Sequence, residues 1–375
     1  MMNNVLKDKK IIIGEKYSTE FVNSNNVFQD GTVPFCRDKN GTLWAMSGHS
    51  HMGDISMFSG KDFNDMKLVY PITLNFCVGH ADYAFDKRSY PECVKARGSV
   101  WPFGLYICPN TNRFFCFFHN ETGWNGKGTA YDALGYCETP HFDSDFRHIG
   151  LMHSDDEGKT WTFDRWVITA EDVCFTERFN PGAGVAQGQK EGIISLGSGD
   201  FTFFDDVNGD YIYLIYNIIK VDMINGVWKS CNAYVARSRK RNDGVMGDFV
   251  KYYDGSFCEA GNLGKESAIV ENSWHSRIIY SKELGIYIMA SSPIVVDNPN
   301  IIIADYLQLR TSPNLYEWSD PIDVEKDGKK FGSHYHGLLS YHGKGDANSF
   351  EGNKFTLLVG HNGVDVVAYD VEIKD

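Results

Sequence analysis

The sequence lacks the features that mark membrane-spanning and disulfide-built proteins. No apolar run approaches the roughly 20 residues that span a bilayer. The polar segment from Met1 to Lys10 has no apolar core of the kind that a secretory signal requires. The nine cysteines form no CxxC pair, and several lie in apolar runs, as Cys116 does. We therefore expect buried, reduced thiols, no membrane partner, and a cytoplasmic location unless a leader has been removed from a secreted protein.

Positive charge is also scarce. Lys and Arg total 36 against 49 for Asp and Glu, which gives a formal net charge of −13. A surface of this balance repels phosphate backbones and anionic membranes, so we expect no nucleic-acid partner. No linker or low-complexity stretch interrupts the chain, and we predict one domain over residues 1–375.

Aromatic residues and glycine are plentiful, at 14% and 37 residues, which favours many short strands joined by tight turns. A recurring hairpin supports this interpretation. An apolar segment turns at Gly, Asn or Asp and returns through a run rich in Tyr, Phe, Ile and Leu. The five visible return strands are Thr42–Met46, Phe114–Phe118, Tyr211–Tyr216, Ile286–Ala290 and Phe355–Val359.

A second repeat follows most hairpins. Its clearest copy, Ser154–Trp161, fits the Asp-box pattern Ser-x-Asp-x-Gly-x-Thr-Trp. We interpret it as a structural turn in which Ser and Asp side chains bond turn amides and Trp fills the space between strands. Weaker copies are Ser312–Trp318 and Ser59–Phe63, and Ala236–Ser238 occupies the equivalent strand of another unit.

These repeats predict an all-β, five-bladed β-propeller with four-stranded antiparallel blades. The last unit is short, so we expect the early strand at 10–14 to complete it and close the ring. The long segments Tyr70–Gly98, Gly123–Arg147 and Ala170–Ile193 are expected to wall a cleft. The blades are predicted at about 28–72, 98–170, 193–255, 272–325 and 333–374.

Polar and aromatic side chains recur where each blade should meet one mouth of the channel. In a blade, the start of the innermost strand and the end of the next strand lie on the same face of the disc. The side chains found there suit a sugar, whose ring faces stack on aromatics and whose hydroxyls need directed hydrogen bonds. The predicted carbohydrate-binding residues are His49, His51, Trp101, His119, Asn120, Asn217, Trp274, His275, His336 and His361.

Three carboxylates at these positions are candidate catalysts. Glycosidic cleavage generally needs one protonated and one ionised carboxyl group beside the bond. Asp30 and Asp200 lie next to glycines that would let a substrate approach closely. Glu121 follows an apolar strand, where partial burial would raise its pKa as an acid requires. The alternatives without a catalytic role are that the two aspartates are turn residues and that Glu121 forms an ion pair with an arginine.

The histidine pairs leave a second interpretation open. His49 with His51, and His334 with His336, alternate so that both rings share one face of an extended strand. Such pairs can hold a metal, or they can hydrogen-bond hydroxyl groups. We predict no cofactor and no metal ligands, with a structural cation such as calcium as the alternative.

Several runs of the sequence resemble five-bladed propeller glycosidases. The closest pattern is the family, formerly a domain of unknown function, that includes endo-D-arabinanases. Arabinanase, xylosidase and fructosidase propellers are more distant, and sialidases share only the Asp box, because Thr32–Pro34 replaces their Arg-Ile-Pro start. The resemblance covers nearly the whole chain, mainly through scaffold residues. It rests on Asp30–Gly31, Pro34, Gly41–Trp44, Trp101–Gly104, Phe117–Phe118, Tyr234–Ser238 and Leu309–Trp318.

The resemblance implies hydrolysis of furanosides or related glycans by acidic residues at the channel mouth, which matches Asp30 and Asp200. We therefore predict a glycosidase that cleaves an oligo- or polysaccharide, such as an arabinan. Two alternatives remain: a non-catalytic glycan-binding propeller, and a sialidase-like or metal-dependent polysaccharide-degrading enzyme.

Overall fold

The computed structural model describes residues 2–24, 31–49, 54–72, 74, 99–121, 147–170, 193–222, 225, 227–298, 303–361 and 365–375. Two predicted site residues, Asp30 and His51, lie outside these ranges. The backbone of His361 is described but its side chain is not. Most of each long segment that we expect to wall a cleft also lies outside them.

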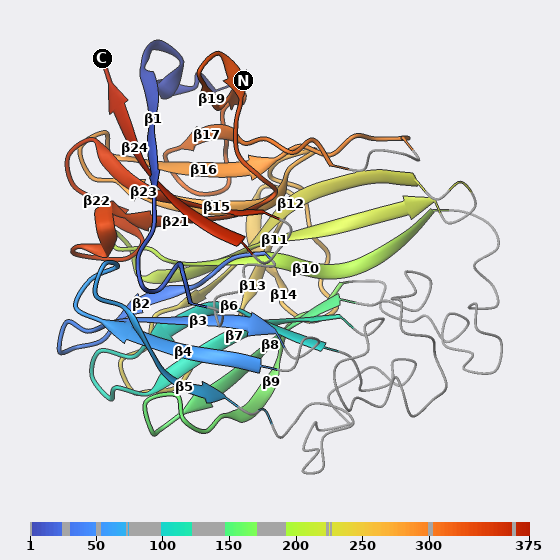
Figure 1. Ribbon diagram of the computed structural model, residues 1–375. Coiled ribbons are helices and arrows are strands. Elements are labelled where there is room, and N and C mark those ends of the chain that lie inside the picture. The colour runs from blue at the N-terminus through green and yellow to red at the C-terminus, as the bar shows by residue number, and fades with distance from the viewer. Residues whose placement is uncertain are drawn as a thin grey trace.

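Strands are the main regular element of the described chain, so the all-β prediction is confirmed (Figure 1). Its helices are the short 3₁₀ helices η1 (Val5–Asp8) and η3 (Tyr341–Gly343). No helix in the described ranges is long and apolar enough to cross a membrane.

The first sheet shows how side chains fix a hairpin. In the turn between β2 and β3, the Asp38 carboxylate accepts the amides of Asn40 and Thr42 and the indole N–H of Trp44. Gly41 supplies the positive φ of 85° that the turn requires. The sheet has the order β2 (Phe35–Arg37), β3 (Leu43–His49), β4 (Asp54–Gly60) and β5 (Lys67–Ile72).

The next nine strands form one hydrogen-bonded sheet that divides naturally into two. A single parallel pair, Gly197 with Arg147, joins the halves. One half contains β6 (Ser99–Ile107), β7 (Phe114–Glu121), β8 (Arg147–Ser154) and β9 (Thr162–Ile168). The other contains β10 (Ile193–Asp205), β11 (Tyr211–Asp222), β12 (Val227–Arg239), β13 (Val250–Tyr253) and β14 (Ser256–Ala260).

The remaining strands form two larger sheets and a small ribbon. One sheet has the order β18 (Ile322–Asp323), β17 (Gln308–Ser312), β16 (Ile286–Ser292), β15 (Trp274–Ser281) and β22 (Ser349–Phe350). The ribbon pairs β19 (Glu325–Lys326) with β20 (Lys329–Lys330). The last sheet has the order β1 (Lys10–Tyr17), β24 (Asp365–Lys374), β23 (Lys354–His361) and β21 (Tyr335–Ser340).

The N-terminal strand completes the last sheet, as predicted. Antiparallel pairing places Ile11 opposite Ile373 and Ile13 opposite Val371. The two strands lie side by side, and both chain ends lie at the top of Figure 1. The strand order therefore combines residues from the two ends of the sequence in one sheet.

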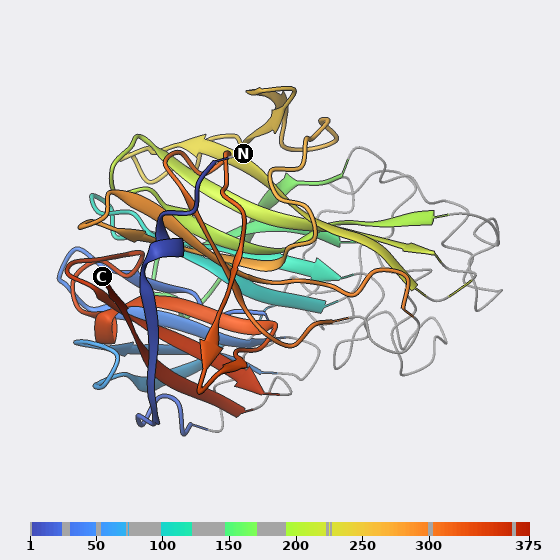
Figure 2. The ribbon, with the colours of Figure 1, turned by 90° about the horizontal axis from the view of Figure 1, so that it is seen from above.

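Hydrophobic clusters join neighbouring sheets. Trp44 of the first sheet shares a cluster with Phe114 of the next, and Phe117 shares a second cluster with Phe203. The last sheet also packs on the first, since Leu358 shares a cluster with Phe35. Figure 2 shows the sheets side by side in the view from above. Two further clusters join β11 to β16 and β16 to β23.

The first strands of the sheets converge on a small internal cavity of about 30 Å³. Each sheet contributes at least one residue to its wall. These residues include Phe35 of β2, Leu105 of β6, Thr202 of β10, Arg277 of β15 and Leu338 of β21. We call this space the axial cavity.

The turn predicted at Ser154–Trp161 has the expected hydrogen bonds. The Ser154 hydroxyl accepts the Gly158 amide, and the Asp156 carboxylate accepts the Thr160 amide. The indole of Trp161 donates to the Gly158 carbonyl and is buried between sheets. The motif therefore fixes a turn and takes no part in a site.

Candidate functional site

A cavity of about 180 Å³ lies where the first strands of three sheets begin. We call it the site pocket. It contains six predicted site residues: Trp101, His119, Glu121, Asp200, Trp274 and His275. It also contains four that the sequence did not single out: Phe103, Arg147, Trp228 and Tyr335.

A larger groove of about 550 Å³ lies between β24 and the turn after β15. Its charged groups include Lys9, which forms a surface ion pair with Asp375. Two acids and a histidine cluster in the smaller pocket instead, where His119, Glu121 and Asp200 are all buried. Catalytic groups need such a desolvated, charged setting, so we place the function in the site pocket.

The backbone around Asp200 is shaped to turn its carboxylate into the pocket. Asp200 has a positive φ of 48°, and the pairing of β10 with β11 shifts register between Gly199 and Thr202. Aspartate tolerates this left-handed conformation better than most residues do. A Cβ at Gly199 would lie 2.3 Å from the ring of His119, so only glycine fits beside that ring.

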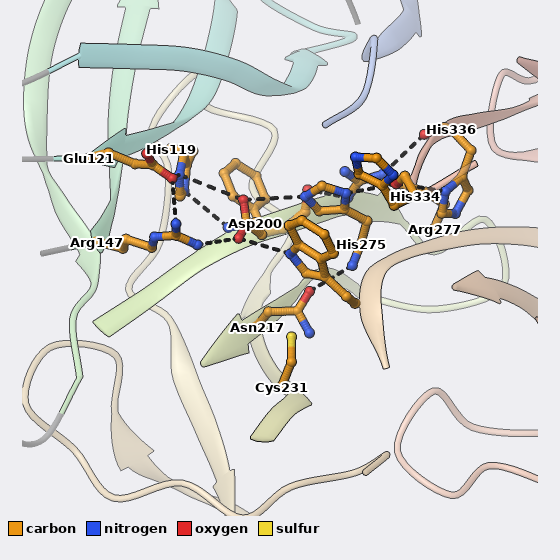
Figure 3. Close-up of polar contacts among 12 residues, drawn as sticks. His119, Glu121, Arg147, Asp200, Asn217, Cys231, His275, Arg277, His334 and His336 are labelled. Carbon is orange, nitrogen blue, oxygen red and sulfur yellow. Dashed lines mark hydrogen bonds and ion pairs between the residues drawn. The ribbon is translucent and has the colours of Figure 1, made fainter. Parts of the chain in front are cut away.

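Asp200 and Glu121 share one arginine (Figure 3). Arg147 Nη1 lies 2.5 Å from Asp200 Oδ2, and Arg147 Nη2 lies 3.0 Å from Glu121 Oε1. The indole of Trp274 also donates to Asp200 Oδ2, over 3.1 Å. Burial alone would raise the pKa of Asp200, but the Arg147 charge holds this pKa well below its usual value. Asp200 is therefore an ionised carboxylate.

The backbone fixes the tautomer of His119. The Asp200 amide donates to His119 Nδ1 over 3.0 Å, so this nitrogen carries a lone pair. The proton then resides on Nε2, which lies 2.8 Å from Glu121 Oε1. The ring also stacks on Phe103, with centroids 5.4 Å apart. His119 thus acts as a neutral donor that orients Glu121.

His275 faces the other oxygen of Asp200. Its Nδ1 lies 2.7 Å from the His334 carbonyl, which can only accept, so Nδ1 carries the proton. Nε2 lies 3.4 Å from Asp200 Oδ1. Burial lowers the pKa of His275, in opposition to the Asp200 charge. With a neutral His275, two acceptor atoms face each other, and a hydroxyl group or a water between them would satisfy both.

Asn217 holds His275 in place. Its Oδ1 accepts the His275 amide over 2.9 Å. Its Nδ2 donates to the carbonyls of Asn232 and Ser273. The side chain of Asn217 therefore bonds backbone groups, and the residue does not line the pocket. Its carbohydrate-binding role stays a prediction.

The acidic side chains of the site pocket raise the question of a bound cation. One ligand atom from each of His119, Glu121 and Asp200 lies within 4.8 Å of the others. Arg147, however, already forms ion pairs with both carboxylates and occupies one oxygen of each. The His119 lone pair accepts the Asp200 amide, so it does not face a shared cation position. This donor set does not fit a metal ion, and we derive no step through one.

The other predicted residues lie around or behind the pocket. His49 is buried and stacks on Trp101, with centroids 5.0 Å apart. Asn120 is fully buried on β7. His336 is also buried, and its Nε2 lies 3.1 Å from the Ala290 carbonyl. These residues are placed near the site but do not line it.

Two of the four missed residues, Arg147 and Trp228, come from strand positions that the blade argument left out. Arg147 begins β8, the third strand of its unit, whereas the sequence argument considered only the first two strands. Trp228 lies near the start of β12, which is also a third strand. The rings of Trp228 and Trp274 meet edge to face, with centroids 5.1 Å apart. Extending the repeat argument to third strands would have found both.

Comparisons with known proteins give a likeness of fold. No family model and no curated protein matches the chain. A candidate exo-β-1,3-galactanase from Bifidobacterium bifidum s17 superposes with a TM-score of 0.50 at 12% identity, over 97% of this chain and 96% of that one. A GH43 β-1,3-galactosidase gives 0.49 at 15% identity, over 96% and 94%. At such identities, the chain shares the fold of β-propeller glycoside hydrolases, and the likeness carries nothing further.

Proposed function

We propose that this protein is a glycoside hydrolase that cleaves an oligo- or polysaccharide in the site pocket. The observation that carries the proposal is Asp200, a buried, ionised carboxylate whose Oδ2 is bound by two donors. Its Oδ1 faces His275 Nε2 across a gap without a fixed proton. Trp and Tyr side chains wall the same pocket and suit the faces of a sugar ring.

Asp200 supplies the ionised member of the carboxyl pair that glycosidic cleavage requires. The nearest oxygens of Glu121 and Asp200 lie within 4.8 Å, whereas inverting pairs are about 6.5–9.5 Å apart and retaining pairs about 5–5.5 Å. This spacing of the two oxygens is nearer to the retaining range than to the inverting range. In one assignment, Glu121 and Asp200 form a retaining pair and Glu121 gives its proton to the leaving group. In the other, Asp30 gives this proton and Glu121 affects the pKa of Asp200 through the arginine that they share.

We also infer that five blades surround one axis and that the first and last blades close the ring. Clusters between successive sheets support this arrangement, including the one that joins Leu358 to Phe35. The axial cavity supports it too, since all the first strands contribute to its wall. The pocket then lies at one mouth of the axis, where a glycan chain has access from solvent.

Two substrate classes have support. The sequence resemblance favours furanosides such as arabinan, and the name of the Bifidobacterium bifidum structure names β-1,3-galactan. A sialic acid is disfavoured because Arg147, the one arginine lining the pocket among the described residues, is already bound by two carboxylates.

Substitution of the carboxylates tests the proposal. We expect Asp200→Asn to fold normally and to lower hydrolysis of the best polysaccharide in a panel by at least about 1,000-fold. Glu121→Gln and Asp30→Asn identify the acid, because the acid variant regains activity on substrates with activated leaving groups. Asp248→Asn, at a side chain that is 97% exposed, is the matched control.

Product analysis by mass decides between catalysis and binding. Saturable sugar binding with no product from the unsubstituted protein would replace the enzyme with a glycan-binding propeller. Full activity in Asp200→Asn would remove Asp200 from the mechanism.

A further inference from the structure

Arg277 is a buried cation without a carboxylate partner among the described residues. It lies on β15 and is 1% exposed. Its Nη1 donates to the Phe201 carbonyl over 2.6 Å, and its Nε lies 3.4 Å from the His336 carbonyl (Figure 3). Its Nη2 is buried and has no hydrogen-bond partner. Carbonyl groups satisfy part of the donor fork but cannot neutralise its charge.

The nearest opposite charge does not compensate Arg277. Burial lowers the pKa of Arg277 to about 9, and the attraction of Asp200 opposes this effect. Asp200, however, already forms an ion pair with Arg147. Arg277 therefore remains charged near neutral pH and carries a desolvation penalty that an additional anion would offset.

The axial cavity adjoins Arg277 and has the size of one small ion. Its volume is about 30 Å³, which exceeds the roughly 10–15 Å³ that a cavity needs to hold one water molecule. Thr32, Thr202 and Asn348 also line it and offer hydroxyl and amide donors. No acidic side chain lines this cavity among the described residues.

We propose that the axial cavity binds one chloride ion, held by Arg277 Nη2 and completed by donors from the cavity wall. A water molecule would satisfy the N–H group but leave the charge uncompensated. A polyatomic anion such as sulfate needs more room than a monatomic halide, and a cation would be repelled by the guanidinium. This site is independent of the proposed function, although Phe103 lines both the axial cavity and the site pocket.

Halide dependence of stability tests the proposal on the full chain. The protein is dialysed into gluconate buffer at fixed ionic strength and neutral pH, and thermal unfolding is followed as chloride, bromide or sulfate replaces gluconate. We expect chloride and bromide to raise Tm by several degrees with saturation, as linkage to a native-state site requires, and sulfate to have no such effect. Crystals grown with bromide should show one anomalous peak beside Arg277 Nη2.

Two arginine variants provide the controls. Arg277→Met should abolish the halide effect on Tm. Arg310→Met should retain it, because Arg310 is also buried but its Nη1 donates to Ser291 and it does not line the axial cavity. The bromide crystal of the unsubstituted protein decides the matter if Arg277→Met fails to fold.

Three results would overturn the site. These are a Tm that is indifferent to halide, an equal halide effect in Arg277→Met, and a cavity that holds only water in the bromide crystal. A protein that hydrolyses no glycan in any buffer would contradict the proposed function but would not affect the halide dependence of Tm.

Discussion

His275 and Asp200 both adopt left-handed backbone conformations, with φ values of 52° and 48°. Such conformations persist when surrounding contacts over-determine them. For His275 those contacts are the Asn217 side chain at its amide and the His334 carbonyl at its ring. The geometry of the pocket thus depends on an asparagine that does not line it.

Asn217→Ala should therefore weaken both stability and activity. It leaves the buried His275 amide without its acceptor and removes a donor from the carbonyls of Asn232 and Ser273, which costs about 1–3 kcal/mol. Chemical denaturation should show this loss, and kcat should fall because His275 is no longer held opposite Asp200. Asn225→Ala, at a residue whose side chain bonds Asp222 at the surface, is the control. Equal kcat in the two variants would show that Asn217 has no positioning role.

The sequence located part of this site because equivalent positions of a repeat converge in space. Trp274 and His275 were found in this way and open the first strand β15, whereas Asp200, also found, lies within β10 beside a register shift. The tautomer of His119 was not predictable, because it depends on an amide that is 81 residues away in the chain. The pairing of Arg147 with two carboxylates likewise arises only when separate sheets pack together.

At the scale of the element, the turns Ser154–Trp161 and Ser312–Trp318 share one design but place different residues at their position of positive φ. Gly158 has a φ of 86° in the first turn, and Leu315 has a φ of 70° at the matching place in the second. In both turns, a tryptophan indole donates to the carbonyl of this residue. Leu315 is 1% exposed, so its burial offsets the backbone strain that glycine avoids.

Glycine substitutions separate backbone strain from packing. Gly41 and Gly158 have nearly equal φ values, 85° and 86°. An added Cβ meets nothing within 4 Å at Gly41 but lies 2.5 Å from Met57 Cε at Gly158. We expect Gly41→Ala to lower the free energy of unfolding by about 1–2 kcal/mol, from backbone strain alone. Gly158→Ala should lower the free energy of unfolding by more than this, because its Cβ also meets Met57. Urea denaturation of both variants measures the two losses, and equal losses would show that Met57 moves aside at no cost.

The hairpins were the most predictable elements, because alternating aromatic strands and Gly or Asn turns carry local signals. The predicted return Phe114–Phe118 lies within β7, and Tyr211–Tyr216 lies within β11. Short strands were not predictable. β22 has only the two residues Ser349–Phe350 and forms because it pairs with the edge of β15, which lies about 70 residues earlier.

At the scale of the whole molecule, closely packed sheets bury ionisable groups that an isolated strand would leave in water. His148 and His336 are 1% and 0% exposed. Burial lowers the pKa of each to about 3. An unfolded histidine has a pKa near 6.5. Both side chains are therefore neutral in the folded protein over a range in which the unfolded chain binds protons.

This difference predicts acid destabilisation that begins well above the pKa of any carboxylate. The unfolded state binds more protons below pH 6.5, so the stability linked to each histidine is complete above that pH and declines as the pH falls towards 3. Between pH 6.5 and 5, each should lower the free energy of unfolding by about 2 kcal/mol. Asp200, whose pKa is depressed, adds a further loss only below about pH 4, as its carboxylate becomes protonated.

Urea denaturation from pH 7.5 to 5 measures how steeply the free energy of unfolding depends on pH, which gives the number of protons taken up on unfolding. His336→Gln should reduce this number by about one. His153→Gln is the control, because His153 lies nearer the surface beside Asp164 and has a side chain that is 21% exposed. A stability that stays constant between pH 7.5 and 5 would mean that these buried rings take up protons without unfolding. The sheets would then have to admit water between them, which contradicts the close packing on which the whole fold depends.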